Sequence, residues 1–263
     1  MHRFTYVPVA QEHGNPTFIQ WFQPNLEETT MTQNGGPCGR TVAPTDRTRL
    51  RRYPERASYA RDDIDSVLDE ALICHLGFTV DGQPYVIPTM CTRVDDFLYL
   101  HGSAASRTLK TVHAASRVCL TASLVDGLVL ARSAFAHSLN YRSVVVLGPV
   151  VKVEDEAEKM NALKMLTNAL IPNRWDDIRP PTPQELKATT VLRMPLREAS
   201  LKWRSGPPSD LDEDLTSEAW SGVIPLEVRA LPPVPAPTLR KSTEVPDEIA
   251  HYTVRQGPHP FSI

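Results

Sequence analysis

The residues best suited to chemistry lie in one short stretch, residues 101–110, which follows an apolar run ending at Leu100. Two hydroxyls and two cations recur there at helical spacing, at Ser103, Ser106, Arg107 and Lys110. If Ser103 caps a helix over residues 103–115, these side chains share one face beside the free N–H groups of the first turn. A helix N-terminus favours an anion, and added cations suit a phosphate. The stretch therefore predicts a phosphate-binding corner; an ordinary capped surface helix is the alternative.

A second polar cluster occupies residues 131–143, between two apolar runs. Its polar side chains are Arg132, His137, Asn140, Tyr141 and Arg142. Functional groups often lie on loops that a rigid scaffold positions, so this segment is a second candidate for the site. A solvated connection, with Asn and Ser present for turn geometry, is the alternative.

The composition indicates a globular chain in a reducing compartment. The 263 residues are 41% hydrophobic and 22% charged, with a net charge of −3, so nucleic acid is not an expected partner. No apolar run approaches the roughly 20 residues that span a bilayer, and the first residues lack the pattern of a secretory signal. The cysteines are widely spaced, at Cys38, Cys74, Cys91 and Cys119. We therefore expect reduced, buried thiols, a cytoplasmic location and no membrane contact.

Short β-branched runs separated by turn signals predict a mainly β protein. The expected strands cover residues 71–80, 85–94, 97–100, 118–125, 128–131, 144–153 and 190–196. Asp81-Gly82 and Asp126-Gly127 are expected as hairpin turns. Helices are expected near residues 62–68, over 155–170 and over 183–188. The order is not strict β-α-β alternation, so an antiparallel barrel with flanking helices is the predicted class.

Proline is concentrated toward the two ends of the chain. We predict an irregular N-terminal extension over residues 1–50, one compact domain over residues 51–227, and a Pro-rich tail over residues 228–263. Met31 is a candidate alternative start.

Several site signatures are absent from the sequence: there is no Rossmann glycine motif, no P-loop, no G-x-S-x-G and no H-E-x-x-H. Histidines at metal-ligand spacing are also absent, so no metal site is predicted.

Taken in order, these segments resemble the FMN-binding split barrel of the pyridoxamine 5′-phosphate oxidase-like superfamily, in its flavin-nucleotide-binding, Nim-type nitroimidazole-resistance branch. The resemblance covers about residues 50–227. The matching segments are Cys74 to Phe78, Asp81 to Pro88, Leu98 to Ser103, Ser106-Arg107, Asp126 to Ser133, Asn140 to Ser143, Trp175, Glu185-Leu186, Lys202, Arg204 and Trp220 to Pro225. One departure is Ala136, where a second histidine is expected before His137.

The resemblance implies a homodimer with FMN at the subunit interface. Its implied cofactor-binding residues are Ile87, Pro88, Thr89, His101, Ser103, Ser106, Arg107, Lys110, Arg142 and Trp220. In this scheme residues 87–89 lie along the flavin ring, the 103–110 face holds the phosphate, and Trp220 covers the ring. His101 and Tyr141 are the candidate catalytic residues, as proton donors.

The expected function is an FMN-dependent oxidoreductase. A reduced nicotinamide would supply hydride, and a small organic molecule such as a nitro compound would accept the electrons. A flavin-binding carrier or sensor without turnover is the alternative, and haem binding by histidine is a third possibility. Pyridoxamine phosphate oxidation is less expected, because only Arg132 and Arg142 could hold the substrate's phosphate.

Overall fold

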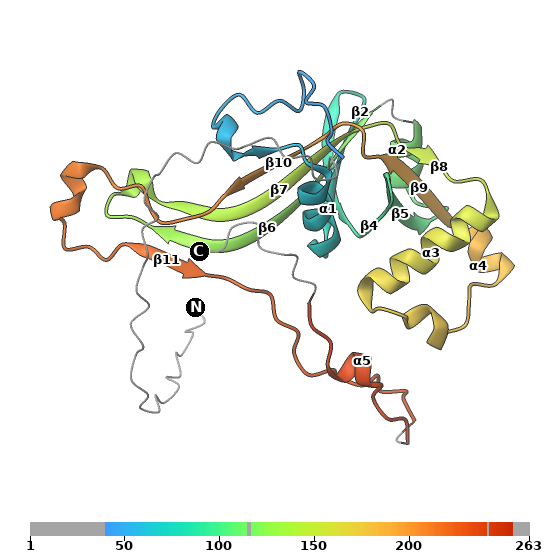
Figure 1. The fold of residues 1–263 in the computed structure, drawn as a ribbon. Coiled ribbons are helices and arrows are strands. Elements are labelled where there is room, and N and C mark those ends of the chain that lie inside the picture. Colours follow the sequence, from blue (N-terminus) through green and yellow to red (C-terminus); the bar gives the residue numbers. More distant parts are fainter. Residues whose placement is uncertain (1–39, 115–116, 241, 255–263) are drawn as a thin grey trace, which may run out of the picture. The chain divides into compact units, whose positions relative to one another are not determined.

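The computed structural model describes residues 40–114, 117–240 and 242–254, and these residues form two antiparallel sheets flanked by helices (Figure 1). In the larger sheet the strand order is β1-β10-β7-β6-β2-β3, and β11 pairs with the end of β6. The smaller sheet has the order β4-β5-β9-β8. Neither strand path closes on itself. The predicted class, mainly β with flanking helices, is confirmed.

The larger sheet comprises β1 (Ala57–Ser58), β2 (Cys74–Val80), β3 (Gln83–Thr89), β6 (Val118–Leu130), β7 (Ser138–Gly148), β10 (Ala199–Arg204) and β11 (Gly222–Pro225). The smaller sheet comprises β4 (Cys91–Val94), β5 (Phe97–Ser103), β8 (Val151–Lys152) and β9 (Thr189–Pro195). The helices are α1 (Arg61–Glu70), α2 (Arg107–Ala114), α3 (Glu156–Leu170), α4 (Pro183–Ala188) and α5 (Asp247–Ala250), with four short 3₁₀ turns.

Three strand predictions need correction. The expected run 144–153 divides into the end of β7, in the larger sheet, and β8, in the smaller sheet. The expected run 85–94 is broken at Met90 into β3 and β4, which belong to different sheets. The expected hairpin turn at Asp126-Gly127 is instead a bulge inside the continuous strand β6, where the register with β7 shifts between Val125 and Gly127. A bulge inserts one unpaired residue and bends the strand. By contrast, Asp81 and Gly82 both have positive φ, 49° and 81°, and form the predicted hairpin between β2 and β3.

Local capping signals explain where two helices begin. The Asp155 side chain accepts a hydrogen bond from the Glu158 N–H at the start of α3, and Thr182 and Glu185 form a reciprocal capping box at α4. The predictions for 155–170 and 183–188 are confirmed. The predicted start of α2 at Ser103 is wrong, because β5 stays paired with β9 through Ser103, and the helix begins at Arg107.

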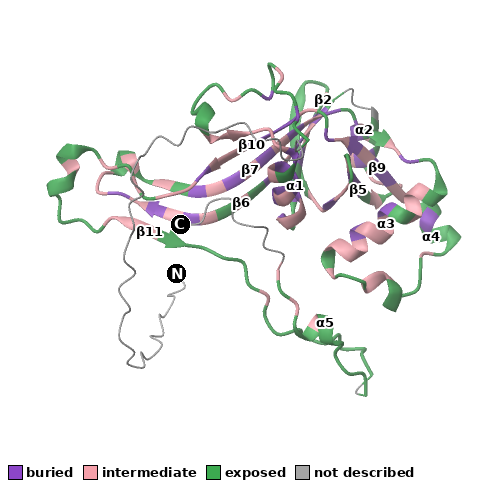
Figure 2. Cartoon of the chain, viewed as in Figure 1, coloured by how far each residue is buried: buried purple, intermediate pink, exposed green. Residues whose placement is uncertain are grey.

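One hydrophobic core joins both sheets to α1 and α2 (Figure 2). Ile64 of α1, Leu120 of β6 and Leu192 of β9 are each 0% exposed. Residues 205–240 and 242–254 are mostly irregular and exposed, apart from η4 (Asp212–Thr216), β11 and α5. The predicted N-terminal extension lies largely outside the described residues, as does Met31. Among the helices of the described ranges, none is both long and apolar enough to cross a bilayer.

Candidate functional site

The corner between β5 and α2 holds the predicted phosphate-binding residues. The Ala104 N–H donates to the Ala188 carbonyl at 2.8 Å, which keeps the chain against the smaller sheet just past Ser103. A turn follows, closed by the Ser106 N–H on the Ser103 carbonyl at 2.9 Å. Ser106, not Ser103, then caps α2, because its hydroxyl accepts from the Leu109 N–H at 3.4 Å. The first-turn N–H groups therefore lie three residues later than the sequence predicts.

The two cations of this corner are open to solvent. Arg107 is the first residue of α2 and Lys110 follows three positions later, and both are exposed. Neither forms an ion pair with any residue of the described ranges. A cation at a helix N-terminus opposes the helix dipole unless an anion lies nearby. The corner therefore retains the features of an anion site, although Ser103 is the last residue of β5 and does not lie on the helix face.

His101 lies at the end of β5, two residues before this turn, opposite Val191 of β9. Desolvation by the surrounding chain lowers the pKa of its imidazole below the ordinary value of 6.5, although the residue keeps an exposed surface. The ring is therefore mainly neutral at pH 7. A neutral imidazole can accept a proton or donate its own N–H.

The residues expected along a flavin ring lie on β3, an edge strand that pairs with β2 alone among the described strands. Ile87, Pro88 and Thr89 face Leu76, His75 and Cys74 across the ladder, respectively. The strand is exposed along most of its length: Val86 is 64% exposed and Ile87 is 36% exposed. An exposed apolar edge of this kind is uncommon unless another surface covers it.

Arg142 is buried and already has two carboxylate partners. Its side chain is 1% exposed, and its guanidinium donates two hydrogen bonds to Glu70 and two to Asp126, at 2.7–3.1 Å. The β6 bulge brings Asp126 to Arg142, and the end of α1 brings Glu70. Contact with a flavin would require Arg142 to leave these partners. Tyr141 lies on the opposite face of β7 and is half-buried.

Trp220 precedes β11 and is 66% exposed. Its indole folds over Gly222, where an added Cβ would lie 2.8 Å from the ring. β11 pairs with residues 127–130 of β6, whereas β2 pairs with residues 119–122. Within one chain, Trp220 and the β3 residues therefore lie near opposite ends of β6. The structure brings His101, Ser103, Ser106, Arg107 and Lys110 together at one corner, and separates Trp220 from β3.

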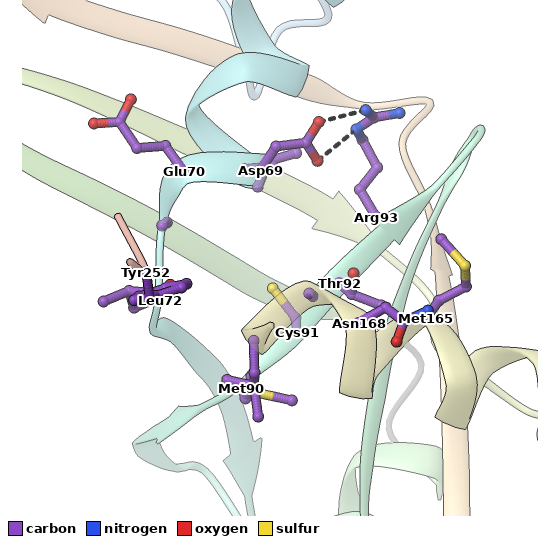
Figure 3. Close-up of a pocket in the computed structure, with 14 residues that line it drawn as sticks. Asp69, Glu70, Leu72, Met90, Cys91, Thr92, Arg93, Met165, Asn168 and Tyr252 are labelled. Carbon is purple, nitrogen blue, oxygen red and sulfur yellow. Dashed lines mark hydrogen bonds and ion pairs between the residues drawn. The ribbon is translucent and has the colours of Figure 1, made fainter. Parts of the chain in front are cut away.

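A cavity of about 230 Å³, which the sequence does not indicate, lies between the end of α1, β4 and α3 (Figure 3). Met90, Cys91 and Met165 contribute sulfur to its lining, and Tyr252 reaches it from the C-terminal segment. Two of its charged side chains pair with each other, since Arg93 makes two hydrogen bonds to Asp69. Four distant segments build this cavity, so no local motif predicts it, and no predicted site residue lines it.

Three of the four cysteines lie within the described residues, where the prediction of buried, reduced thiols can be tested. Cys74 and Cys91 are buried and Cys119 is half-buried, and all three are free thiols. The neighbouring Cys74 thiol and burial raise the pKa of the Cys91 thiol. The Cys91 thiol is accordingly a poor nucleophile at neutral pH. Cys38 lies outside the described residues.

Two open antiparallel sheets, an edge strand and a cationic strand-to-helix corner together define a flavin-binding split-barrel fold. Residues 60–203 match the family described as pyridoxamine 5′-phosphate oxidase, and the chain belongs to this family. A comparison with curated proteins finds no match.

Solved structures give the same assignment. The flavocytochrome Anf3 from Azotobacter vinelandii is 40% identical, with a TM-score of 0.75, over 79% of this chain and 97% of that chain. The FAD and heme binding protein from Mycobacterium smegmatis is 32% identical, with a TM-score of 0.73, over 76% and 98%. A candidate 5-nitroimidazole antibiotic resistance protein from Bacteroides thetaiotaomicron is 25% identical, with a TM-score of 0.47, over 56% and 85%.

Proposed function

We propose that the protein is a homodimeric flavin-dependent oxidoreductase that passes electrons from a reduced nicotinamide to a small organic acceptor, such as a nitro compound. The main observation in favour of flavin binding is the β5–α2 corner. There Arg107 and Lys110 lie beside the capped start of α2, without ion-pair partners in the described chain. FMN supplies the phosphate that this corner fits. FAD carries the corresponding phosphate within its pyrophosphate, so the corner accommodates either flavin.

A second subunit would complete this site. The proposed flavin contacts on β3 and at His101 are exposed in the single chain, and Trp220 lies near the other end of β6. A flavin ring needs apolar cover on its faces, and an indole is a suitable cover. In the proposed dimer, Trp220 of one protomer covers the flavin held by β3 and the β5–α2 corner of its partner.

The bound flavin would supply the redox chemistry. The chain would supply the binding groups: the α2 N–H groups and Arg107 hold the phosphate, and β3 lies along the ring. His101, neutral at pH 7, would exchange a proton with the reacting molecule, and Tyr141 would serve as a second proton donor.

Haem is a second cofactor that we propose, because the two relatives at 40% and 32% identity are a flavocytochrome and an FAD and heme binding protein, and nearly their whole length is matched. In that case the protein would transfer electrons between flavin and haem. The visible absorption spectrum of freshly purified protein, with mass analysis of the molecules released on denaturation, distinguishes FMN, FAD and haem. Purified protein with neither flavin nor haem, and unable to bind added FMN or FAD, would contradict the proposal.

Arg107→Ala tests the flavin site directly. Loss of one charge-assisted contact costs about 1.5–3 kcal/mol, so flavin affinity should fall roughly ten- to a hundred-fold while the fold is retained. Arg229→Ala is the matched control, since Arg229 is also exposed and lies in the C-terminal segment.

Steady-state oxidation of reduced nicotinamide with a panel of acceptors then separates an enzyme from a carrier. Light scattering should give twice the chain mass of 29.3 kDa.

A further inference from the structure

A second concentration of positive charge lies where the segment before β1 meets the end of β10, just outside the matched residues 60–203. Four residues form what we call the Arg56 cluster: Arg52, Tyr53, Arg56 and Arg204. Residues 47–56 contain five arginines and one acidic residue, Glu55, although the whole chain has a net charge of −3. Such local charge marks a surface that an anion would approach.

The fold itself builds the Arg56 cluster. The 3₁₀ turn η1 (Pro54–Arg56) leads directly into β1, where Ala57 pairs with Lys202 of β10. This pairing carries Arg56 alongside the end of β10, where Arg204 lies opposite Tyr141 of β7. Tyr53 has φ 57° and is partly exposed, with the guanidinium carbons of Arg52 and Arg56 lying 5.1 Å and 4.3 Å from its ring centre.

Arg204 supplies a buried charge with no acid to balance it. The residue is 8% exposed, and its guanidinium donates to the Asn140 side-chain oxygen and to the carbonyls of Gly206 and Pro207. All three acceptors are neutral, and within the described part of the chain it forms no ion pair with a carboxylate. Burial and the nearby Arg56 charge lower the pKa of Arg204. A buried cation is ordinarily paired with an anion.

The other charges of the cluster are also poorly balanced. The nearest acid to Arg56 is Glu55, at 3.9 Å, and its side chain is 64% exposed. Arg52 forms no ion pair among the described residues, and its guanidinium lowers the pKa of the Tyr53 hydroxyl. By contrast, Arg47 is held by Glu198, and Arg61 is held by Asp65. Arg52 and Arg56 therefore lie over the Tyr53 ring with little acid to balance them.

We propose that the Arg56 cluster binds the phosphate groups of a small anionic molecule. Guanidinium groups bind phosphate oxygens in pairs, and two or three of them around one anion give geometric selectivity. The Tyr53 ring fixes two of the guanidinium groups against one apolar surface. This site is separate from the β5–α2 corner and does not depend on the flavin assignment.

Sodium pyrophosphate is the probe, titrated calorimetrically into the purified protein against sodium chloride of equal ionic strength. Pyrophosphate should bind to the wild-type chain, and Arg56→Gln and Arg52→Gln should each weaken it roughly ten-fold or more. Arg49→Gln is the matched control, because Arg49 is an exposed arginine of the same segment that touches neither the ring nor an acid in the described structure. This control should change affinity by less than about two-fold.

The source of the phosphate is tested with NADPH and NADH in the same titration. If NADPH binds more tightly than NADH, and Arg56→Gln removes this difference, the ligand is a dinucleotide phosphate. If NADPH and NADH bind equally and weakly, the ligand class is pyrophosphate or a simpler phosphate compound. Arg204→Lys tests the buried member, with thermal unfolding as its folding control. No pyrophosphate binding above the chloride control, or equal losses in Arg56→Gln and Arg49→Gln, would overturn the proposal. The flavin spectrum should stay unchanged in Arg52→Gln and Arg56→Gln, so failure here is separate from failure of the flavin site.

Discussion

Arg142 is a buried cation between two largely buried carboxylates, and its removal would take from each the cation that now pairs with it. The Glu70 and Asp126 side chains are 12% and 16% exposed. Breaking a buried ion pair by removing one member typically costs about 3–5 kcal/mol. Arg142→Met should therefore lower the free energy of unfolding by about this amount in urea denaturation. Coupling it with Glu70→Gln and Asp126→Asn should recover part of the loss, because no unpaired charge then remains.

The control for this prediction is Lys152→Met. The Lys152–Glu154 pair is exposed on both sides, at 39% and 75%. Exposed pairs contribute about 0–1 kcal/mol, so this variant should be close to wild type. If Arg142→Met also lowers the free energy of unfolding by only about 0–1 kcal/mol, the buried cluster does not stabilise the fold as proposed.

His101 gives the protein a pH dependence whose sign follows from its burial. Its pKa in the folded chain lies below 6.5, so the unfolded chain binds a proton at His101 at a higher pH than the folded chain does. The free energy of unfolding should fall as the pH drops from about 6.5 through the folded pKa. Imidazole titration by NMR should show the lowered value, and His101→Gln should remove this part of the slope. A folded pKa above 6.5 would contradict the desolvation argument.

At the scale of elements, the structure of the β5–α2 corner depends on which serine caps the helix. The Ser106 hydroxyl accepts from the Leu109 N–H in the first turn of α2, whereas the Ser103 hydroxyl accepts from the Ala105 N–H within the exposed turn. Replacing an N-cap serine with alanine costs about 1 kcal/mol. Ser106→Ala should show this loss in urea unfolding and faster amide exchange in α2, while Ser103→Ala should cost less. Equal effects would mean that the helix begins earlier.

The elements that sequence could predict are those whose signals are local. Asp155 and the Thr182 capping box mark the starts of α3 and α4 within four residues, so those helices could be predicted closely. Asp126-Gly127 is a strong local turn signal, yet two distant partners override it: Arg142 binds the aspartate, and β11 pairs along the following residues. Ser103 failed as a cap for the same reason, because β9 extends the strand through it.

The same distinction holds for the candidate site. The spacing of Ser106, Arg107 and Lys110 is local, so the cationic corner could be predicted even though the helix start was misplaced. The partners of Arg142 come from α1 and from a bulge, and no spacing within the polar cluster indicates them. The cation pair Arg56 and Arg204 is likewise formed by β1 joining β10, across about 150 residues of chain, a distance over which sequence pattern carries no geometric information.

At the scale of the whole molecule, the end of the compact fold is set by β11. This strand pairs with Gly127–Leu130 of β6, and Val129 beneath it is 0% exposed. Beyond Leu226, whose N–H donates to the Asp126 carbonyl at 3.0 Å, the described chain makes few regular contacts. The predicted boundary between the compact domain and the tail, at residues 227 and 228, can therefore be tested by truncation.

Chains ending after Glu227 and after Ser217 should behave differently. The longer chain keeps β11 and should unfold close to the temperature of the full chain. The shorter chain exposes Val129 and leaves the N–H and C=O groups of one β6 edge unpaired. Exposure of one buried valine costs about 1.5–3 kcal/mol, which corresponds to a fall in Tm of roughly 3–12 °C for a chain of this size. An open apolar edge also promotes association, so light scattering should show aggregates of the shorter chain. If both chains unfold together, β11 is not part of the cooperative fold, and a Trp220 carried beside it could not be held in place over a bound flavin.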